Sequence, residues 1–382
     1  MPRAAALLIG FGVLLAACSP AATPSATQAP AVAPTTPAPT AAPAAAGSTS
    51  APAAAPTTAP TIAGAAPPTA PVAAPTAAPA AQTVALHVSY SNLIADNLPE
   101  WLAYESGIFK QHGLDVTLDN IASSTGIPAL LSGEIQIAHL GGSETLSAAA
   151  GGGDLVVVAV TGPVYPFVFM APASIATVQD LKGKKIGVSN AGSSSDIATR
   201  VFLKNVGLDP DKDLSIIAVG SLQNRTAALL SGAIDGGLAQ PPDQLALEDH
   251  GFHVLYDLAA QKLPSVGDSI VVRREWLNAN HDVMQRYIDS IVQAIALSKK
   301  DKEQSLPVLS KYLKNDDQRA MSVTYDFFVG TVTPDYPVVT ADLWGDAVQQ
   351  LGAQNDKINS FDLSSMLDNT FVKSAMDRKV GP

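Results

Sequence analysis

The feature that most constrains the folding of this 382-residue chain is a long segment without charge. Between Arg3 and Asp96 there is no Asp, Glu, Lys or Arg, and residues 19–82 are almost entirely Ala, Pro and Thr with some Ser. A segment with no charge pattern, no aromatic residue and no apolar periodicity cannot bury a core. Dense proline favours extended polyproline II backbone. We therefore predict a disordered, semi-rigid stalk over residues 18–83, whose Thr and Ser beside Pro also allow O-glycosylation.

The N-terminus carries a basic tip, a short apolar run over residues 4–14 and the sequence Leu-Ala-Ala-Cys at 15–18. This pattern predicts a secretory signal peptide over residues 1–17. Its apolar run is shorter than the ~20 residues that span a bilayer. The ending resembles the lipobox of bacterial lipoproteins, which implies that Cys18 is lipidated and becomes the new N-terminus. We expect an extracytoplasmic protein, at the cell surface or in the periplasm, held on the cell membrane by a lipid anchor.

The remaining residues, about 84–382, are numerous enough for a large core or two lobes. The net charge of −11 argues against a nucleic-acid partner. Cys18 is the only cysteine, so the folded part has no disulfide and no cysteine nucleophile. The six histidines show no metal-binding spacing, and we predict no metal, no cofactor and no catalytic residue. A monomer is expected.

Strand-like and helix-like segments alternate along this folded part. The expected strands are residues 86–90, 114–118, 135–140, 155–160, 168–170, 185–188, 214–219, 234–238 and 254–256. Helical patterns lie between most of them, and the chain from about residue 276 is mostly helical. This alternation predicts an α/β fold with mainly parallel sheets flanked by helices.

An internal repeat indicates two lobes of the same architecture. Residues 129–136, Ala-Leu-Leu-Ser-Gly-Glu-Ile-Gln, recur as Ala-Leu-Leu-Ser-Gly-Ala-Ile-Asp at 228–235. Each copy is the end of an apolar helix, a glycine cap and the start of a strand. The strand ends at 140–143 and 239–242 are then equivalent. Because ligands of open α/β sheets bind beyond the carboxyl ends of strands, we expect these two ends to face each other across a cleft.

Several blocks over about residues 84–292 resemble the solute-binding proteins of bacterial ABC importers. The blocks are Pro-Glu-Trp-Leu-Ala at 99–103, Gly-Ile-Phe-Lys at 107–110, Gly-Leu-Asp-Val at 113–116, Leu-Ser-Gly-Glu-Ile-Gln-Ile-Ala at 131–138, Asp-Leu-Lys-Gly-Lys-Lys-Ile-Gly-Val at 180–188, Gly-Leu-Asp-Pro at 207–210 and Ser-Gly-Ala-Ile-Asp-Gly at 231–236. The similar branch takes sulfonates, taurine, nitrate or the pyrimidine precursor of thiamine. The resemblance implies a two-lobed periplasmic-binding-protein fold of type II, with lobe 1 at 84–170 and 267–382 and lobe 2 at 171–266. It also implies two hinge segments, a small-molecule solute and an ABC permease as partner.

Strand ends and helix starts give the candidate ligand contacts. They are Ser91, Asn92, Gly141, Gly142, Ser143 and Tyr165 in lobe 1, and Ser193, Ser194, Ser195 and Gln240 in lobe 2. A helix start rich in serine favours an anion, although Ser193 could equally serve only as the helix cap. Glu144 and Asp196 nearby argue against a fully charged anion.

Some assignments stay open at this point. Trp101 and His139 fit a structural role better than a ligand contact, and Tyr165-Pro166-Phe167 fit either a core segment or a stacking surface for a planar ring. The solute is accordingly a small organic molecule or oxyanion, or alternatively a thiamine-precursor pyrimidine or other heterocycle. A receptor coupled to a sensor, and an enzyme, are the competing classes. Related enzymes depend on cysteines that this chain lacks.

Overall fold

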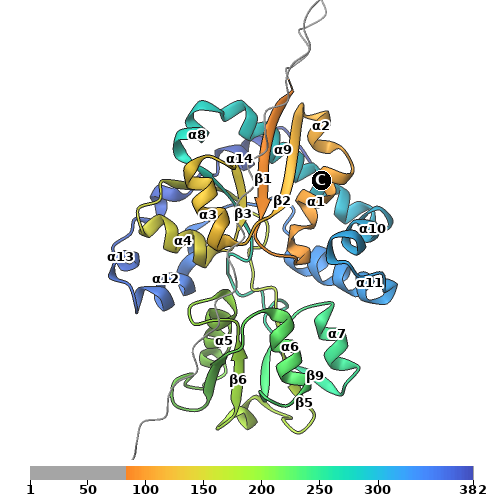
Figure 1. Cartoon of the computed structure of the whole chain (residues 1–382), viewed down its shortest axis with the longest axis vertical. Helices are drawn as coiled ribbons and strands as arrows, with labels where there is room; N and C mark the ends of the chain where they lie inside the picture. Colours follow the sequence, from red (N-terminus) through yellow and green to blue (C-terminus); the bar gives the residue numbers. More distant parts are fainter. Residues whose placement is uncertain (1–82, 382) are drawn as a thin grey trace, which may run out of the picture. The chain divides into compact units, whose positions relative to one another are not determined.

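The computed structural model describes residues 83–381, so the predicted signal peptide, Cys18 and the stalk lie outside the described residues. The described chain forms two five-stranded β-sheets, each flanked by helices (Figure 1). This confirms the predicted α/β fold class with two sheets. Within residues 83–381, no helix is both long enough and apolar enough to cross a membrane.

The first sheet has the strand order β2-β1-β3-β10-β4. Its strands are β1 (Val84–Tyr90), β2 (Leu114–Asn120), β3 (Ile137–Leu140), β4 (Leu155–Val160) and β10 (Ser269–Arg273). β1 pairs in parallel with β2 and β3, whereas β10 runs antiparallel between β3 and β4. Strand β10 was not predicted from the sequence.

The second sheet has the strand order β7-β6-β8-β5-β9. Its strands are β5 (Val168–Pro172), β6 (Lys185–Val188), β7 (Ser215–Ala218), β8 (Gly236–Ala239) and β9 (Phe252–Asp257). β5 takes the place that β10 has in the first sheet, antiparallel between two neighbours. The two sheets therefore have the same topology, which agrees with the internal repeat. Residues 168–170, assigned to lobe 1 from the sequence, belong instead with the second sheet because β5 pairs with β8 and β9.

Two segments, residues 161–167 and 258–268, connect the sheets. They are hydrogen-bonded to each other: the amide of Gly267 donates to the carbonyl of Gly162 at 2.7 Å, and the amide of Ser265 donates to the carbonyl of Pro163 at 3.1 Å. An isolated antiparallel bridge joins Val164 to Pro264. The connection between the sheets is thus a ribbon of two paired segments.

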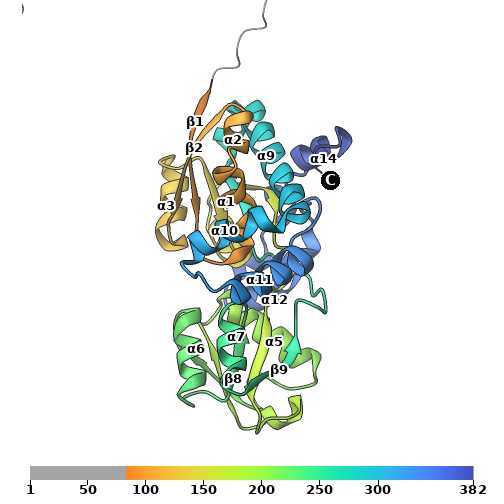
Figure 2. The same ribbon diagram turned by 90° about the vertical axis from the view of Figure 1, so that its right-hand side faces the viewer.

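Helices flank both sheets (Figures 1 and 2). Around the first sheet they are α1 (Leu98–Glu105), α2 (Ile108–Gln111), α3 (Ser123–Ser132), α4 (Gly142–Ala150), α8 (Arg274–Ala279), α9 (His281–Lys300), α10 (Lys302–Leu313), α11 (Gln318–Phe327), α12 (Gly345–Gly352), α13 (Asp356–Asn359) and α14 (Thr370–Asp377). Around the second they are α5 (Ser194–Asn205), α6 (Leu222–Leu230) and α7 (Asp243–Glu248). Short 3₁₀ helices span Ala95–Asn97, Val178–Leu181, Ala341–Trp344 and Leu363–Met366, and a π-helical turn spans Phe328–Val332. The expected helical tail is confirmed.

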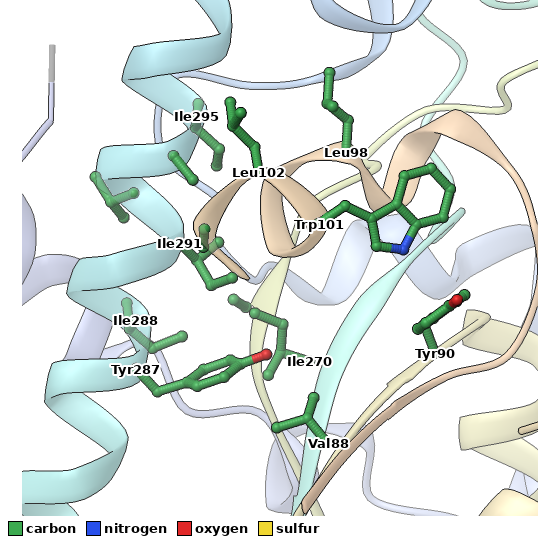
Figure 3. Close-up of a cluster of buried hydrophobic side chains, with 14 of the residues drawn as sticks. Val88, Tyr90, Leu98, Trp101, Leu102, Ile270, Tyr287, Ile288, Ile291 and Ile295 are labelled. Carbon is green, nitrogen blue, oxygen red and sulfur yellow. The ribbon is translucent and has the colours of Figure 1, made fainter. Parts of the chain in front are cut away.

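The main core lies where α1 and α9 cover the first sheet (Figure 3). Apolar side chains of the long helix α9, such as Ile291 and Ile295, face Leu102 of α1. Trp101 is fully buried in this core and stacks on Tyr312, with ring centroids 4.6 Å apart. The structural interpretation of Trp101 is therefore confirmed, because the indole lies inside the fold.

Candidate functional site

A cavity of about 170 Å³ lies where the carboxyl ends of β1 and β3 meet the start of α5 and the end of β8. Both connecting segments contribute to its wall. The lining residues are Ser91, Asn92, Ile94, Asp96, Ser123, Gly141, Glu144, Tyr165, Pro166, Phe167, Ser194, Gln240, Ser265 and Gly267. Strand ends from the two copies of the repeat thus meet at one cavity, as expected for ligand sites of open α/β sheets.

Six of the predicted contacts line this cavity: Ser91, Asn92, Gly141, Tyr165, Ser194 and Gln240. Ser193 and Ser195 line an adjoining hollow of about 470 Å³ that shares Asn92, Ser194 and Gln240 with the cavity. Gly142 and Ser143 lie deeper, in a narrow space beside Trp344. The amide of Gly142 is already used, since it donates to the carbonyl of Val266 at 3.0 Å. This glycine serves packing, because a Cβ there would lie 2.5 Å from Cβ of Val266.

The start of α5 presents unused hydrogen-bond donors to the cavity. Ser193 is the N-cap, and its hydroxyl accepts from the amide of Asp196. The hydroxyl of Ser195 is also engaged, accepting from the amide of Ser189 at 2.9 Å. By contrast, the amides of Ser194 and Ser195 and the hydroxyl of Ser194 have no hydrogen-bond partner among residues 83–381. Capping and anion binding are therefore compatible here, because different serines perform them.

The carboxylate of Asp196 does not oppose an anion at this helix start. Its Oδ2 accepts from the amide of Gly192 at 2.8 Å, and its Oδ1 accepts from Nε of Arg200 at 2.9 Å. Arg200 pairs with Asp196 within the same helix and also with Asp211 at 2.8 Å. The acidic character that the sequence suggested for this end of the cavity is thus reduced.

A buried cation, Arg225 of α6, lines the adjoining hollow. Its Nε donates to the carbonyl of Leu238 at 2.6 Å and its Nη1 donates to the hydroxyl of Ser189 at 3.1 Å. Within residues 83–381 it forms no ion pair at 4.0 Å or less. Burial lowers the pKa of Arg225 to about 10, although the negative charge of Asp243 raises it in part. The guanidinium therefore remains charged at neutral pH. A buried charge without a close counter-ion is costly, and an anionic ligand offsets that cost.

Sequence reasoning missed Arg225, although glycines in the neighbouring strands were a usable signal. A Cβ on Gly237 would lie 3.1 Å from Cδ of Arg225, and a Cβ on Gly187 would lie 3.5 Å from its Cγ. The stem of the arginine therefore crosses β6 and β8 where these strands lack side chains. A glycine inside a strand often marks such a close approach.

Two carboxyl groups line the opposite wall. Glu144 lies in the first turn of α4, and its Oε2 is buried without a hydrogen-bond partner among the described residues. Asp96 is 3% exposed, and its burial raises its pKa well above the usual range, with the nearby Asp268 adding to the effect. Raised pKa values favour the neutral carboxylic acid, which can donate a hydrogen bond. The cavity is therefore rich in carboxyl groups on this wall, whereas the adjoining hollow carries the cationic Arg225 on the side of α6.

Aromatic residues of the first connecting segment complete the wall. Tyr165 and Phe167 are both buried and both line the cavity. The hydroxyl of Tyr165 donates to Oδ2 of Asp346 at 3.3 Å, and burial raises the pKa of this phenol. Gln240 at the end of β8 is buried, with its Oε1 lacking a partner among the described residues. These groups provide ring surface and one amide for orienting a small solute.

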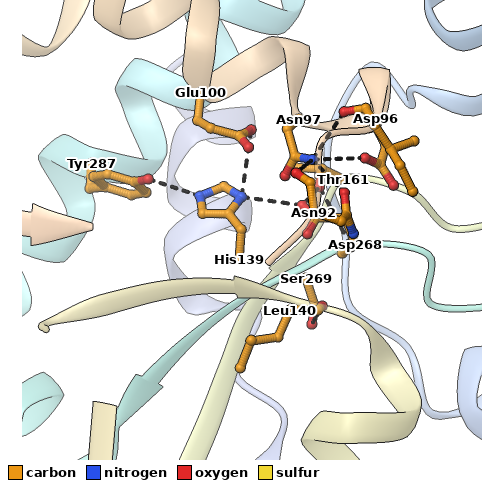
Figure 4. A network of polar contacts seen from close by, with 11 residues as sticks. Asn92, Asp96, Asn97, Glu100, His139, Leu140, Thr161, Asp268, Ser269 and Tyr287 are labelled. Atoms are coloured by element: carbon orange, nitrogen blue, oxygen red, sulfur yellow. Dashed lines mark hydrogen bonds and ion pairs between the residues drawn. The ribbon is translucent and has the colours of Figure 1, made fainter. Parts of the chain in front are cut away.

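His139 lies behind the cavity wall, not in it (Figure 4). One ring nitrogen, Nε2, lies 2.9 Å from the hydroxyl of Tyr287, and Nδ1 lies 3.2 Å from Oδ2 of Asp268. The side chain is fully buried. His139 is therefore an internal residue and does not line the cavity, as the sequence analysis favoured.

The two matched sheets, the paired connection between them and the cavity at their strand ends define a periplasmic-binding-protein fold. Residues 95–305, more than half of the chain, match the profile described as "NMT1/THI5 like". The chain belongs to this NMT1/THI5-like family, which confirms the resemblance found in the sequence.

Individual relatives agree with this assignment. A putative binding protein of Brucella abortus is 26% identical over 258 residues, which are 61% of this chain and 77% of the relative. A putative aliphatic sulfonates-binding protein of Escherichia coli is 30% identical over 189 residues, covering 48% of this chain and 58% of the relative. The crystal structure of the periplasmic aliphatic sulphonate-binding protein SsuA from Escherichia coli superposes with a TM-score of 0.62 at 22% identity, covering 75% of this chain and 92% of SsuA.

One match is to an enzyme. The 4-amino-5-hydroxymethyl-2-methylpyrimidine phosphate synthase THI13 of Saccharomyces cerevisiae is 28% identical over 159 residues, which are 40% of this chain and 45% of the enzyme. This match covers less of the chain than the two binding proteins do.

Proposed function

We propose that this protein is the extracytoplasmic receptor of an ABC importer and captures a small organic anion, of the sulfonate, taurine or nitrate kind, in the cavity between its sheets. The observation that carries the proposal is the cationic wall. Ser194 and Ser195, whose amides have no hydrogen-bond partner among residues 83–381, line the same hollow as the buried Arg225. Helix starts and buried arginines both favour oxyanions.

Capture in this proposal is a hinge closure. Ser194 at the start of α5 and Gln240 after β8 lie on the side of the second sheet, whereas Ser91, Asn92 and Gly141 follow strands of the first. All five line one cavity. An anion held by the cationic wall also contacts the first sheet and draws the two together about the connecting segments. The closed, loaded form is the one that the permease recognises.

A second candidate ligand is a planar heterocycle, such as a thiamine-precursor pyrimidine. It is favoured by the aromatic wall of Tyr165 and Phe167 and by the unpartnered Oε1 of Gln240. An aromatic side chain stacks on such a ring, and the side-chain amide forms hydrogen bonds with the polar atoms at the edge of the ring. The carboxyl groups of Asp96 and Glu144 on that side suit the ring nitrogens and amines of a pyrimidine better than a second anion.

Solute identification tests both candidates. Native mass spectrometry of freshly purified protein should reveal a co-purified small molecule by its mass. At a hundredfold excess over its dissociation constant, the true solute should stabilise the folded state by about 2.7 kcal/mol, seen as a higher unfolding temperature. It should also reduce the radius of gyration in solution scattering. Sulfonates that leave both quantities unchanged, while a pyrimidine moves them, would replace the first candidate by the second.

A receptor accounts for this chain better than an enzyme or a sensor input. The relatives that cover more of this chain are described as binding proteins. Cys18 is the only cysteine of the sequence, so the folded part has no residue for cysteine-dependent chemistry. Incubation with the identified solute separates the classes. Stoichiometric retention without turnover supports a receptor, and product formation would support an enzyme. A sensor-coupled receptor would co-purify with a membrane kinase or chemoreceptor in place of a permease.

Anchoring through Cys18 is part of the same proposal. It rests on the Leu-Ala-Ala-Cys sequence after the apolar run and on the charge-free stalk that follows it. A receptor must stay near its permease, and acyl chains on one residue hold it at the membrane surface, at ~0.8 kcal/mol per buried methylene.

Cys18→Ser should therefore move the protein from the membrane pellet to the soluble fraction without changing its unfolding temperature. The physical reason is that the hydroxyl cannot accept the thioether-linked lipid. Ser19→Ala, one residue along, is the matched control and should stay in the pellet. A Cys18→Ser protein that still sediments with membranes would rule out the anchor.

A further inference from the structure

Three atoms of metal-ligand type converge inside the first lobe, behind the cavity (Figure 4). Nδ1 of His139 lies 3.5 Å from Oε2 of Glu100 and 3.2 Å from Oδ2 of Asp268. All three ligand atoms lie within 4.8 Å of one another, and the side chains are 0%, 0% and 2% exposed. They come from β3, α1 and the second connecting segment, so no spacing in the sequence reveals them.

A contact at the second ring nitrogen, Nε2, fixes the orientation of His139. Its Nε2 lies 2.9 Å from the hydroxyl of the fully buried Tyr287 of α9. When Nε2–H donates to this hydroxyl, the lone pair of Nδ1 points between the two carboxylates. Three acceptors then face one another. Oδ2 of Asp268 accepts from the hydroxyl of Thr161 at 2.5 Å, whereas the carboxylate oxygens of Glu100 have no donor among the described residues. Metal-bound histidines are held in this way, with the second ring nitrogen fixed by an outer partner.

Glu100 is a buried carboxyl group that lacks a hydrogen-bond donor among the described residues. Both of its carboxylate oxygens are buried, and neither has a hydrogen-bond partner among residues 83–381. A buried carboxylate without donors is among the most unfavourable groups in a protein interior. One divalent cation cancels the charge of two carboxylates and supplies the missing partner.

The spacing selects the kind of cation. Ligands bound at about 2.1 Å in a tetrahedral site lie about 3.4 Å apart, close to the 3.2 and 3.5 Å measured here. Charge-assisted hydrogen bonds are shorter, at about 2.7–2.9 Å. One imidazole and two carboxylates suit a transition-metal ion, whereas Ca²⁺ takes six to eight oxygen ligands.

We propose that His139, Glu100 and Asp268 bind one divalent transition-metal ion, for which Zn²⁺ fits best. Asp96, on the side of Asp268 away from Tyr287 (Figure 4), lines the cavity. The ion joins α1 and β3 to the second connecting segment. The carbonyl of Asp268 in turn accepts from the amides of Thr161 and Gly162 in the first connecting segment. Metal binding therefore stiffens the hinge end of the first lobe, whatever solute the cavity takes.

The test uses the untagged full-length chain, stripped with EDTA and titrated with ZnCl₂ in a calorimeter, with MnCl₂ and CaCl₂ for comparison. We expect one Zn²⁺ per chain, a higher unfolding temperature with Zn²⁺, and no comparable effect of Ca²⁺. Glu100→Gln and His139→Gln should each weaken Zn²⁺ binding by more than about 100-fold, because loss of even an outer partner costs ~10–100-fold. Tyr287→Phe should cost about 10-fold by the same reasoning.

The chain offers a matched control in another His–Asp pair. Nε2 of His87 lies 2.8 Å from Oδ2 of Asp119 on the exposed part of the same sheet, and His87→Gln should leave Zn²⁺ binding unchanged. A wild-type chain that takes up no stoichiometric Zn²⁺ would overturn the proposal, and so would Glu100→Gln or His139→Gln chains that bind Zn²⁺ as the wild type does.

A second measurement needs no variant that must fold. Co²⁺ added to the stripped wild-type chain should give visible absorption bands of a low-symmetry nitrogen and oxygen site, and paramagnetically shifted ring signals of one buried histidine. Bands typical of hexa-aqua Co²⁺, with no shifted histidine, would show that a proton, not a metal, holds the three side chains together.

Discussion

Arg225→Met should weaken the binding of the anionic solute by about 10–100-fold, since a hydrogen bond to a charged group contributes about 1.5–3 kcal/mol. The replacement keeps most of the stem, which packs over Gly187 and Gly237, and removes only the guanidinium. With the cation gone, the remaining donors at this wall are the helix start of α5. Isothermal titration with the solute identified by mass spectrometry measures the change.

The control for this prediction is Arg319→Met. Arg319 pairs with Asp249 on the surface, its side chain is 64% exposed, and it lines neither the cavity nor the adjoining hollow. The Arg319→Met variant should bind the solute with the same affinity as the wild type. Arg225→Lys separates charge from geometry, because a point charge replaces the planar fork. An unchanged dissociation constant for the anion in Arg225→Met would mean that the ligand does not reach the guanidinium.

The internal repeat was the part of the fold that local sequence could reveal. Each copy needs a glycine with positive φ to end its helix, at Gly133 with φ of 86° and at Gly232 with φ of 73°. Apolar residues before each glycine and an isoleucine after it fix the helix and the strand on either side. Because this information is short-range, the equivalence of β3 and β8, and hence of the strand ends at Gly141 and Gln240, could be predicted.

Strand β10 was missed because its place depends on distant residues. Ile270, Val271 and Val272 form a short apolar run, which periodicity alone does not assign to strand or helix. The run becomes a strand because the second connecting segment returns it between β3 and β4, to which it is antiparallel. The same return brings Asp268 to His139. A metal-type cluster assembled by such a crossing leaves no spacing for sequence reasoning to detect.

The cavity residues also separate into those that local sequence could predict and those that depend on tertiary packing. Residues directly after strands, such as Ser91 and Gly141, were predicted because the topology rule places strand ends at ligand sites. Arg225 was missed because it lies within a helix, and its direction is set by packing against β6 and β8. Gly142 was taken for a point of close ligand approach, but its space is filled by Val266. Which glycine faces a ligand and which faces a side chain depends on tertiary packing.

Trp101→Ala should destabilise the folded state by about 3–5 kcal/mol, the usual cost of truncating a buried aromatic side chain. Trp101 is fully buried, stacks on Tyr312 at 4.6 Å and meets the edge of Tyr90 at 5.6 Å. Truncation therefore leaves a cavity in the contact between α1 and α10 and removes both ring contacts. Denaturant unfolding gives the free energy, and Trp276→Ala, at a half-buried tryptophan of the same lobe, should cost clearly less.

The informative comparison is between stability and solute affinity. Because Trp101 lies outside the cavity wall, the Trp101→Ala chain that remains folded should bind the solute with a dissociation constant close to that of the wild type. Trp101→Phe keeps an aromatic ring and removes the indole Nε1, which is buried without a partner among the described residues, so it should cost less than Trp101→Ala. If the alanine variant instead keeps its stability and loses the solute, the tryptophan is a ligand contact and the cavity extends behind α1.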